Sequence, residues 1–332
     1  LRLGDDPLLF QGGLMDWFGP AFRSAVAQGG LSIAVTGAGS WLGQSFLSML
    51  AAEGLLPEPA RLRLFASSSR AVQLGGRTVP VERLERAPAL EGGPWLLLHF
   101  AFLGKERTEH LSTADFIAAN AGILRETLRI AEPARDLRMV FSSSGAAYGR
   151  DRRLVEDPDA NPYGWCKVTQ EADLTAWCAA RGVPLVIPRI FSIGGDWVNK
   201  TESYALSSFI LAARREGVIR IMARKPVFRS FVHVAELNGL LCEAALAQAG
   251  EAALVFDTAG RETLEMADLA DAVAGALRPA EIRIERAGPL EGETDYYVGE
   301  GRVYRSILAR NGCRVVGIER IVADTAAFLN RA

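Results

Sequence analysis

Tyr163 and Lys167 stand four positions apart at the start of a segment with helical periodicity. Residues with this spacing share one face of a helix, so the phenol and the ammonium can point into one site. A tyrosine with an ordinary pKa near 10 is a poor base at neutral pH, but a nearby positive charge stabilises its phenolate. The chain has six tyrosines and four lysines, and no other Tyr-x-x-x-Lys pair. The pair therefore indicates proton transfer at a carbon–oxygen centre.

Three consecutive hydroxyl side chains, Ser142, Ser143 and Ser144, follow an apolar segment at 139–141. If that segment is a buried parallel strand, the hydroxyls lie at its carboxyl end, where such sheets open their ligand cleft. One of them can then hydrogen-bond the oxygen of a carbonyl that gains or loses hydride. The alternative is a serine-rich loop that caps its own backbone. The neighbouring tyrosine–lysine pair makes us favour catalysis.

A glycine-rich turn separates an apolar run at 31–35 from a helical pattern at 42–53. Glycines there allow a tight turn and let the backbone approach a pyrophosphate, while the helix N-terminus offers unpaired N–H groups. In this context we favour a dinucleotide site over a purely structural turn. The predicted contacts are Gly37, Gly39, Ser40, Trp41, Leu42 and Gly43.

The apolar run at 62–65 is followed by polar residues that include Ser67, Ser68 and Arg70, and by no acid. A carboxylate at this point would bind the adenosine ribose hydroxyls and repel a 2′-phosphate, whereas hydroxyls and a guanidinium would bind that phosphate. The sequence therefore favours NADP as cofactor, with NAD as the alternative. In the other interpretation this is an ordinary polar loop whose arginine faces water.

Short apolar runs alternate with segments of helical period from residue 31 to residue 190. This alternation predicts an α/β fold with a doubly wound parallel sheet, covered by helices on both faces, of Rossmann type. The expected strands are 31–35, 62–65, 78–81, 95–100, 139–141 and 185–187, and the expected helices are 42–53, 114–131 and 163–181.

After Gly195 the alternation loosens, which indicates a smaller C-terminal lobe built from discontinuous pieces. We expect a helix at 204–215, a strand at 218–222 and a strand at 253–257 that returns to the sheet. An amphipathic piece at 14–26 predicts a short helix in the N-terminal segment. The expected parts are an N-terminal helical preface (1–30), a dinucleotide-binding domain (31–190 plus about 231–260) and a substrate-binding lobe (191–230 plus 261–332).

The 332-residue chain carries a net charge of −2, which argues against nucleic acid or an anionic membrane as a bulk partner. Its four cysteines lie far apart and its three histidines are scattered, so we expect neither disulfides nor a metal site. No apolar run reaches membrane-spanning length, and the first residues do not read as a signal peptide. We expect a cytoplasmic enzyme.

These motifs, in this order, resemble the extended short-chain dehydrogenases/reductases, in particular their nucleotide-sugar epimerase, dehydratase and reductase branch. The resemblance covers the chain from Leu31 onward. Further matching segments are His99-Phe100-Ala101, Asn120, Pro188 to Gly195, and Arg229 to Val234. The sequence departs from the family pattern at Ser40, where the middle glycine of the turn is usual, and at Ser192 and Asp257, where asparagines are frequent.

The resemblance implies roles for individual residues. Ser144 corresponds to the catalytic serine or threonine and Asn120 to a structural and proton-relay asparagine, while His99, Ala101, Pro188, Tyr163 and Lys167 lie against the cofactor. Arg229, aided by Asn199, Lys200 or Arg189, would bind the substrate diphosphate. For His233, packing or loop anchoring is favoured over catalysis. The helices that carry Asn120 and Tyr163 form the dimer interface in many relatives, so we expect a homodimer.

The residues after Ser144 narrow the reaction. Dehydratases and decarboxylases of this family carry an acidic residue there, whereas here Gly145 and Ala146 cannot transfer a proton. A 4-epimerase and a 4-ketoreductase remain. Because the second strand lacks its acid, we favour NADPH-dependent reduction of an NDP-4-keto-(6-deoxy)sugar, with an NDP-sugar 4-epimerase holding NAD as the alternative. A non-catalytic NADP sensor and a reductase of non-nucleotide carbonyls are the less favoured hypotheses.

Overall fold

The computed structural model describes residues 16–331, apart from 249, 251, 279–280 and 312–314. Residues 1–15 of the predicted N-terminal preface therefore lie outside the described residues. The chain divides into two compact units. The first unit holds the described residues up to Arg189 together with Asn238–Phe256, and the second holds Ile190–Leu237 together with the described residues from Asp257 onward.

The first unit is built on one large sheet, whose strand order β13-β8-β6-β5-β1-β2-β4-β3 is that of a doubly wound fold. The prediction of a Rossmann-type α/β fold is confirmed. Its strands are β1 (Ser32–Thr36), β2 (Leu62–Ala66), β3 (Arg70–Leu74), β4 (Arg77–Arg83), β5 (Trp95–His99), β6 (Leu137–Phe141), β7 (Ser143–Ser144), β8 (Leu185–Ile190) and β13 (Leu254–Asp257).

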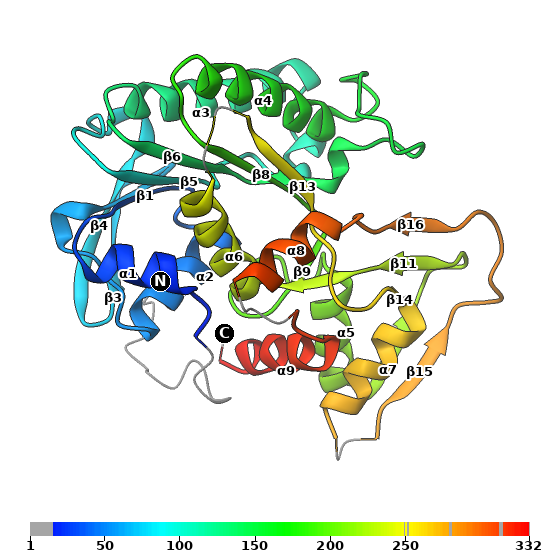
Figure 1. Ribbon diagram of the computed structural model, residues 1–332. Helices are drawn as coiled ribbons and strands as arrows, with labels where there is room; N and C mark the ends of the chain where they lie inside the picture. Colours follow the sequence, from blue (N-terminus) through cyan, green and yellow to red (C-terminus); the bar gives the residue numbers. More distant parts are fainter. Residues whose placement is uncertain (1–15, 249, 251, 279–280, 312–314, 332) are drawn as a thin grey trace. The chain divides into compact units, whose positions relative to one another are not determined.

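The central strands read as continuous apolar runs because helices cover both faces of the sheet. All residues of β1 and β5 are buried, and β1 pairs in parallel with β2 and with β5. The helices α3 (Thr113–Ala131) and α4 (Pro162–Ala179) lie on one face, while α1 (Pro20–Ala27) and α2 (Trp41–Ala52) lie on the other (Figure 1). The strand predicted at 253–257 does return to the sheet, as β13.

One edge of the sheet differs from the prediction. Arg70, placed in a loop by the sequence analysis, is the first residue of β3, which pairs antiparallel with β4. Gly75 and Gly76 close this hairpin with φ of +52° and +74°. Consecutive residues with positive φ are typical of a two-residue hairpin turn that suits glycine. The hairpin was missed because its polar, exposed first residues lack the apolar run of a buried strand.

The N-terminal helix α1 starts at Pro20, later than the predicted residue 14, because proline fits the first position of a helix. The Phe22 ring stacks on Phe18 at 4.5 Å, and its backbone N–H donates to Glu243 Oε1 at 2.7 Å. Glu53 Oε1 likewise accepts the backbone N–H of Trp17 at 2.9 Å. Two carboxylates of the first unit thus hold the segment that precedes the sheet.

The second unit consists of short strands and helices. Its helix α5 (Ala205–Glu216) and strand β10 (Val218–Ile221) agree with the predicted 204–215 and 218–222. Its other elements are β9 (Ser192–Gly194), β11 (Val227–Arg229), β12 (Phe231–His233), β14 (Leu264–Glu265), α7 (Met266–Ala276), β15 (Arg283–Arg286), β16 (Asp295–Tyr297), α8 (Arg302–Arg310) and α9 (Ile318–Leu329), and α6 (Val234–Ala247) continues from it into the first unit.

None of the helices in the described part of the chain is both long enough and apolar enough to cross a membrane.

Candidate active site

Lys167 links helix α4 to the serine-rich end of β6. Its side chain is buried, and Nζ donates a hydrogen bond to Ser142 O at 2.7 Å. The same ammonium lies 3.6 Å from the centroid of the Phe102 ring. Burial lowers the pKa of Lys167 to about 7, although the Glu171 carboxylate opposes this shift. The lysine therefore changes charge near neutral pH.

The start of α4 packs directly on the turn after Ser144. Asn161 caps the helix by accepting the Gly164 N–H at 2.9 Å, and its Nδ2 donates to Ala146 O at 3.1 Å. A Cβ on Gly164 would collide with the same Ala146 oxygen. A residue without a side chain is thus required here, and it brings the first turn of α4, with Tyr163, against the serine segment.

The serines have separate partners. Ser144 Oγ accepts the Ala146 N–H at 3.1 Å, while Ser143 Oγ donates to the Glu171 carboxylate. Glu171 also accepts two hydrogen bonds from Arg189, from Nη2 at 2.5 Å and from Nε at 3.0 Å. The sequence analysis considered Arg189 as a diphosphate ligand, but here its charge is already paired with a buried carboxylate.

A further hydrogen bond of Arg189 reaches the loop that follows the serines. Its Nη1 donates to Tyr148 Oη at 2.6 Å. The buried carboxylate and the tyrosine together fix this guanidinium at the end of β8. Pro188, which precedes it, is buried within the same strand.

Asn120 anchors the loop that follows β5. Its Oδ1 accepts the Leu103 N–H at 2.9 Å, and its Nδ2 donates to Phe116 O at 3.1 Å. Its backbone oxygen accepts a hydrogen bond from Gln170 Nε2 on α4 at 2.9 Å. The side chain is fully buried. This geometry is that of a structural asparagine between α3, α4 and the loop.

His99 lies below the glycine turn and not at its surface. It is fully buried, and Nδ1 is 2.7 Å from Thr36 Oγ1. Burial, and secondarily the charge of Lys167, lowers the pKa of His99 to about 3, so the ring is neutral. The family resemblance implies that His99 lies against the cofactor. Because the ring is fully buried, its influence on a cofactor would pass through the residues around it.

The glycine turn forms with Ser40 in place of the usual glycine. Ser40 has extended backbone angles (φ −74°, ψ 167°), which any residue can adopt, and its Oγ accepts the Gly43 N–H at 3.1 Å. Gly37 does need to be glycine, because its φ is +74° and a Cβ would lie 2.6 Å from Ala101 N. A Cβ on Gly43 would lie 2.5 Å from Gly37 O.

Arg70 lies against this turn. A Cβ on Gly39 would collide with Arg70 Nη2, so the guanidinium sits directly beside the glycine backbone. Ser67 and Ser68 are exposed in the loop before Arg70. A turn with glycines at positions 37 and 39, a helix N-terminus and a guanidinium together suit a phosphate-bearing dinucleotide.

Trp41 and Leu42, by contrast, are buried at the start of α2. The backbone oxygen of Leu42 accepts a hydrogen bond from Asn238 Nδ2 at 3.1 Å. Their side chains therefore pack in the interior, and only their backbone N–H groups are available at the N-terminus of α2.

The predicted substrate residues belong to the second unit. Arg229 Nη1 donates to Asp295 Oδ1 at 3.1 Å and to Phe228 O at 2.8 Å, and its guanidinium lies 5.5 Å from the Tyr297 ring centroid. Its positive charge thus has a partner within the chain, and an anionic ligand would have to share Arg229 with Asp295. Asn199 is exposed and Lys200 is half-buried in the segment after β9.

His233 anchors the start of α6, as the sequence analysis favoured. Its Nδ1 accepts the Ala235 N–H at 3.1 Å, and its Nε2 lies 3.2 Å from Asp324 Oδ2. The ring is fully buried.

Two residues of the site were not predicted from the sequence: Glu171, the partner of Ser143, and Phe102, the partner of Lys167. Glu171 had a signal, because it follows Lys167 by four residues on the same helix. Phe102 had none, since nothing in a loop sequence indicates that a phenylalanine ring will cover a buried ammonium.

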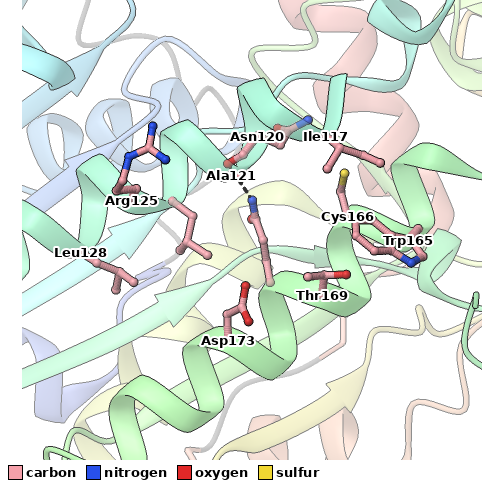
Figure 2. Close-up of a pocket in the computed structure, with 11 residues that line it drawn as sticks. Ile117, Asn120, Ala121, Arg125, Leu128, Trp165, Cys166, Thr169 and Asp173 are labelled. Carbon is pink, nitrogen blue, oxygen red and sulfur yellow. Dashed lines mark hydrogen bonds between the residues drawn. The ribbon is translucent and has the colours of Figure 1, made fainter. Parts of the chain in front are cut away.

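A pocket of about 410 Å³ opens between α3 and α4 (Figure 2). Its walls are mostly apolar, and Arg125 and Asp173 project from opposite helices beside it. The lining residues are Ile117, Asn120, Ala121, Leu124, Arg125, Leu128, Trp165, Cys166, Thr169, Gln170 and Asp173.

Comparison with known proteins gives a family match over most of the chain. The model of the NAD-dependent epimerase/dehydratase family matches residues 33–279. A dTDP-L-rhamnose 4-epimerase from Burkholderia thailandensis is 30% identical over 142 residues, which is 39% of this chain and 39% of that protein. The matched region thus spans about two fifths of the length of this curated relative.

Solved structures share the fold at low sequence identity. A UDP-glucose 4-epimerase from Brucella ovis in complex with NAD is 17% identical with a TM-score of 0.67, covering 90% of this chain and 98% of the other. The NAD-dependent NDP-hexosamine 5,6-dehydratase TunA is 16% identical with a TM-score of 0.69, covering 91% and 98%. A UDP-N-acetylglucosamine 4-epimerase from Methanobrevibacter ruminantium is 14% identical with a TM-score of 0.67, covering 90% and 98%.

The contact between α4 and the serine turn gives a stability prediction. Gly164→Ala should lower the free energy of unfolding by about 1–3 kcal/mol, because the new methyl group displaces Ala146 O. Gly122→Ala is the control, since Gly122 lies within α3 and its Cβ would meet nothing closer than the end of Arg125, at 3.6 Å. It should be neutral or stabilising by up to ~1 kcal/mol. Urea unfolding followed by tryptophan fluorescence measures both, and equal effects would contradict the packing argument.

Proposed function

The chain belongs to the NAD-dependent epimerase/dehydratase family, and from that premise we propose that it interconverts an alcohol and a ketone at C4 of a nucleoside-diphosphate sugar, as a 4-epimerase that retains its NAD. It is an enzyme of the extended short-chain dehydrogenase/reductase kind. Relatives support the epimerase. A dTDP-L-rhamnose 4-epimerase is its partial relative, and a UDP-glucose 4-epimerase with bound NAD shares its fold.

The observation that carries the proposal is the packing of α4 on the serine segment. Lys167 Nζ bonds Ser142 O, and Gly164 leaves no gap against Ala146 O, so Ser144, Tyr163 and Lys167 belong to one rigid assembly. The residues after Ser144 carry no acid. Such a site can move one proton at one oxygen, which suffices for alcohol–ketone interconversion but not for loss of water.

Each side chain then has a defined task. Tyr163, as phenolate, removes the proton of the C4 hydroxyl as hydride leaves C4, and returns a proton when the C4 oxygen becomes an alkoxide again. Ser144 donates a hydrogen bond to the same oxygen. A nicotinamide dinucleotide held by the glycine turn would accept the hydride and give it back.

Lys167 would hold the nicotinamide ribose in this scheme, and its charge would stabilise the Tyr163 phenolate. Because burial lowers the pKa of Lys167 to about 7, this stabilisation is complete below neutral pH and fades above it. The substrate diphosphate would be bound by Arg229 with Lys200 and Asn199, and Arg229 would exchange part of its contact with Asp295 for the phosphate.

One observation favours a second candidate, the NADPH-dependent reduction of an NDP-4-keto-(6-deoxy)sugar. Arg70 lies beside Gly39, and the segment after β2 contains serines and no acid. A guanidinium there would attract the 2′-phosphate of NADP. As a reductase, the site would use Tyr163 to protonate the C4 alkoxide once in each turnover, and bound NADPH would supply the hydride.

Deuterium transfer separates the two candidates. With an NDP-hexose deuterated at C4, an epimerase should yield the C4 epimer with the deuterium retained and without net formation of reduced dinucleotide, as measured by NMR and absorbance at 340 nm. A reductase should instead oxidise NADPH in the presence of an NDP-4-keto-6-deoxy sugar.

Tyr163→Phe should lower the turnover number of either enzyme by at least ~100-fold, because the proton donor is lost. Tyr296→Phe, at an exposed tyrosine, is the control. Undiminished turnover of Tyr163→Phe would refute both candidates.

The cofactor preference is tested at Arg70. If this guanidinium binds a 2′-phosphate, Arg70→Ala should weaken NADPH binding about tenfold relative to NADH, as measured by calorimetry. Arg83→Ala, at an exposed arginine of β4 that pairs with Glu85, should change neither affinity. An unchanged NADPH-to-NADH ratio in Arg70→Ala would speak for NAD and hence for the epimerase.

We also propose that the chain forms a homodimer through α3 and α4. The apolar pocket between these helices lies on the surface that many relatives of this kind use for dimerisation, and it would be filled by a second copy (Figure 2). The oppositely charged Arg125 and Asp173 beside it can pair across a two-fold axis.

Ala121 tests this interface, because it is exposed on α3 and lines the pocket. Ala121→Glu should convert a dimer to a monomer, as it buries an unpaired charge at the contact. Ala172→Glu is the control, at an exposed position of α4 outside the pocket lining. Light scattering coupled to size-exclusion chromatography measures the mass, and a monomeric parent chain or a dimeric Ala121→Glu variant would exclude this interface.

A further inference from the structure

Phe102 is held in place from both sides. On one side Ala101 packs against the glycine turn, where a Cβ on Gly37 would lie 2.6 Å from Ala101 N. On the other side the Leu103 N–H donates to Asn120 Oδ1 at 2.9 Å. The backbone around Phe102 is therefore fixed by the glycine turn and by the buried side-chain amide of Asn120.

The Phe102 ring touches both members of the tyrosine–lysine pair. Lys167 Nζ lies 3.6 Å from its centroid, over the ring face. Tyr163 meets the same ring edge to face, with centroids 5.4 Å apart and an interplanar angle of 79°. Phe116 packs against it at 6.4 Å from the side of α3. A ring face attracts a cation and an edge-to-face contact orients a second ring, so both contacts are directional.

From these contacts we propose that Phe102 is a positioning residue for the reaction, which holds the Lys167 ammonium and the Tyr163 ring in their working orientation and keeps water from the ammonium. The inference rests on the proposed function, because it assigns Tyr163 and Lys167 their tasks. Phe102 itself exchanges no proton. It acts through the two residues that it contacts.

The charge state of Lys167 is the natural readout, and other titratable groups surround it. On α4 these are Cys166, Glu171 and Tyr163, and from β5 there is His99. The Glu171 carboxylate is paired with Arg189. Burial lowers the pKa of His99 to about 3 and raises that of Cys166 to about 11, so neither of these two groups titrates near neutral pH. Burial is the main cause that lowers the pKa of Lys167.

Two substitutions should therefore move the pKa of Lys167 in opposite directions. Phe102→Ala admits water to the ammonium, relieves the main cause of the shift, and should raise the pKa from about 7 by ~1 unit or more. Phe102→Leu keeps water out but removes the ring face, and should lower it by about one unit. Phe102→Tyr keeps both features and should titrate like the parent chain.

The titration can be followed directly, because the chain has only four lysines. With ¹³C-labelled lysine, NMR of the ligand-free protein gives one signal for each Cε, and Lys167→Met identifies that of Lys167. The signals of Lys105, Lys200 and Lys225 are internal controls. The pH profile of kcat/KM should shift in the same direction as the Lys167 titration in the Leu variant, and Phe102→Tyr should restore the parent profile.

Each outcome decides. A lower pKa of Lys167 in Phe102→Leu, together with a shifted pH profile of kcat/KM, supports the proposal. This holds whether or not Phe102→Ala folds. An unchanged pKa of Lys167 in Phe102→Leu overturns the proposal. A shifted pKa with an unchanged pH profile of kcat/KM also overturns it. Since the NMR measurement needs neither cofactor nor substrate, an error in the proposed function would appear separately, as a parent chain without turnover.

Discussion

Burial of one ammonium is the constraint on which the rest of the site depends. The Lys167 ammonium loses its hydration when it is buried. A hydrogen bond to Ser142 O and the face of the Phe102 ring replace part of that hydration. An incompletely compensated buried charge is costly, and a lysine responds by losing its proton more easily. Three elements, β6, α4 and the loop after β5, must keep their places for these contacts to form. That requirement explains why a glycine stands at position 164 and why Asn120 secures the loop.

The buried acid Glu171 adds a second layer to this arrangement. It joins Ser143 to the guanidinium at the end of β8, so the ends of β6 and β8 are connected through one helix, α4. A pair of this kind contributes little net stability, because both ions have lost their hydration. Its effect is geometric. It fixes the relative position of β8 and α4, and Ser143 is bonded to the same carboxylate.

Most of the first unit could be predicted from the sequence because its strands are covered on both faces and therefore read as unbroken apolar runs. β1 and β5 are clear examples. The tyrosine–lysine pair and the glycine turn could be found because their chemistry needs fixed spacing along the chain. The β3–β4 hairpin was missed because its exposed residues carry no apolar run. The contacts of Lys167 with Phe102 and of Arg189 with Tyr148 join segments that lie far apart in the sequence. Such contacts follow from the packed fold and leave no spacing to detect.

The segment before the sheet has a practical consequence for anyone who shortens this protein. It resembles a dispensable leader, since the repeating pattern starts only at residue 31. Yet Glu243 and Glu53 are hydrogen-bonded to backbone N–H groups of this segment, and Phe46 of α2 packs on its aromatic rings. Trimming to the first strand would remove the backbone partners of both acids and would expose the Phe46 ring of α2. A shortened chain therefore needs to keep the described segment from Asp16 onward, because the Asp16 carboxylate also pairs with Arg23.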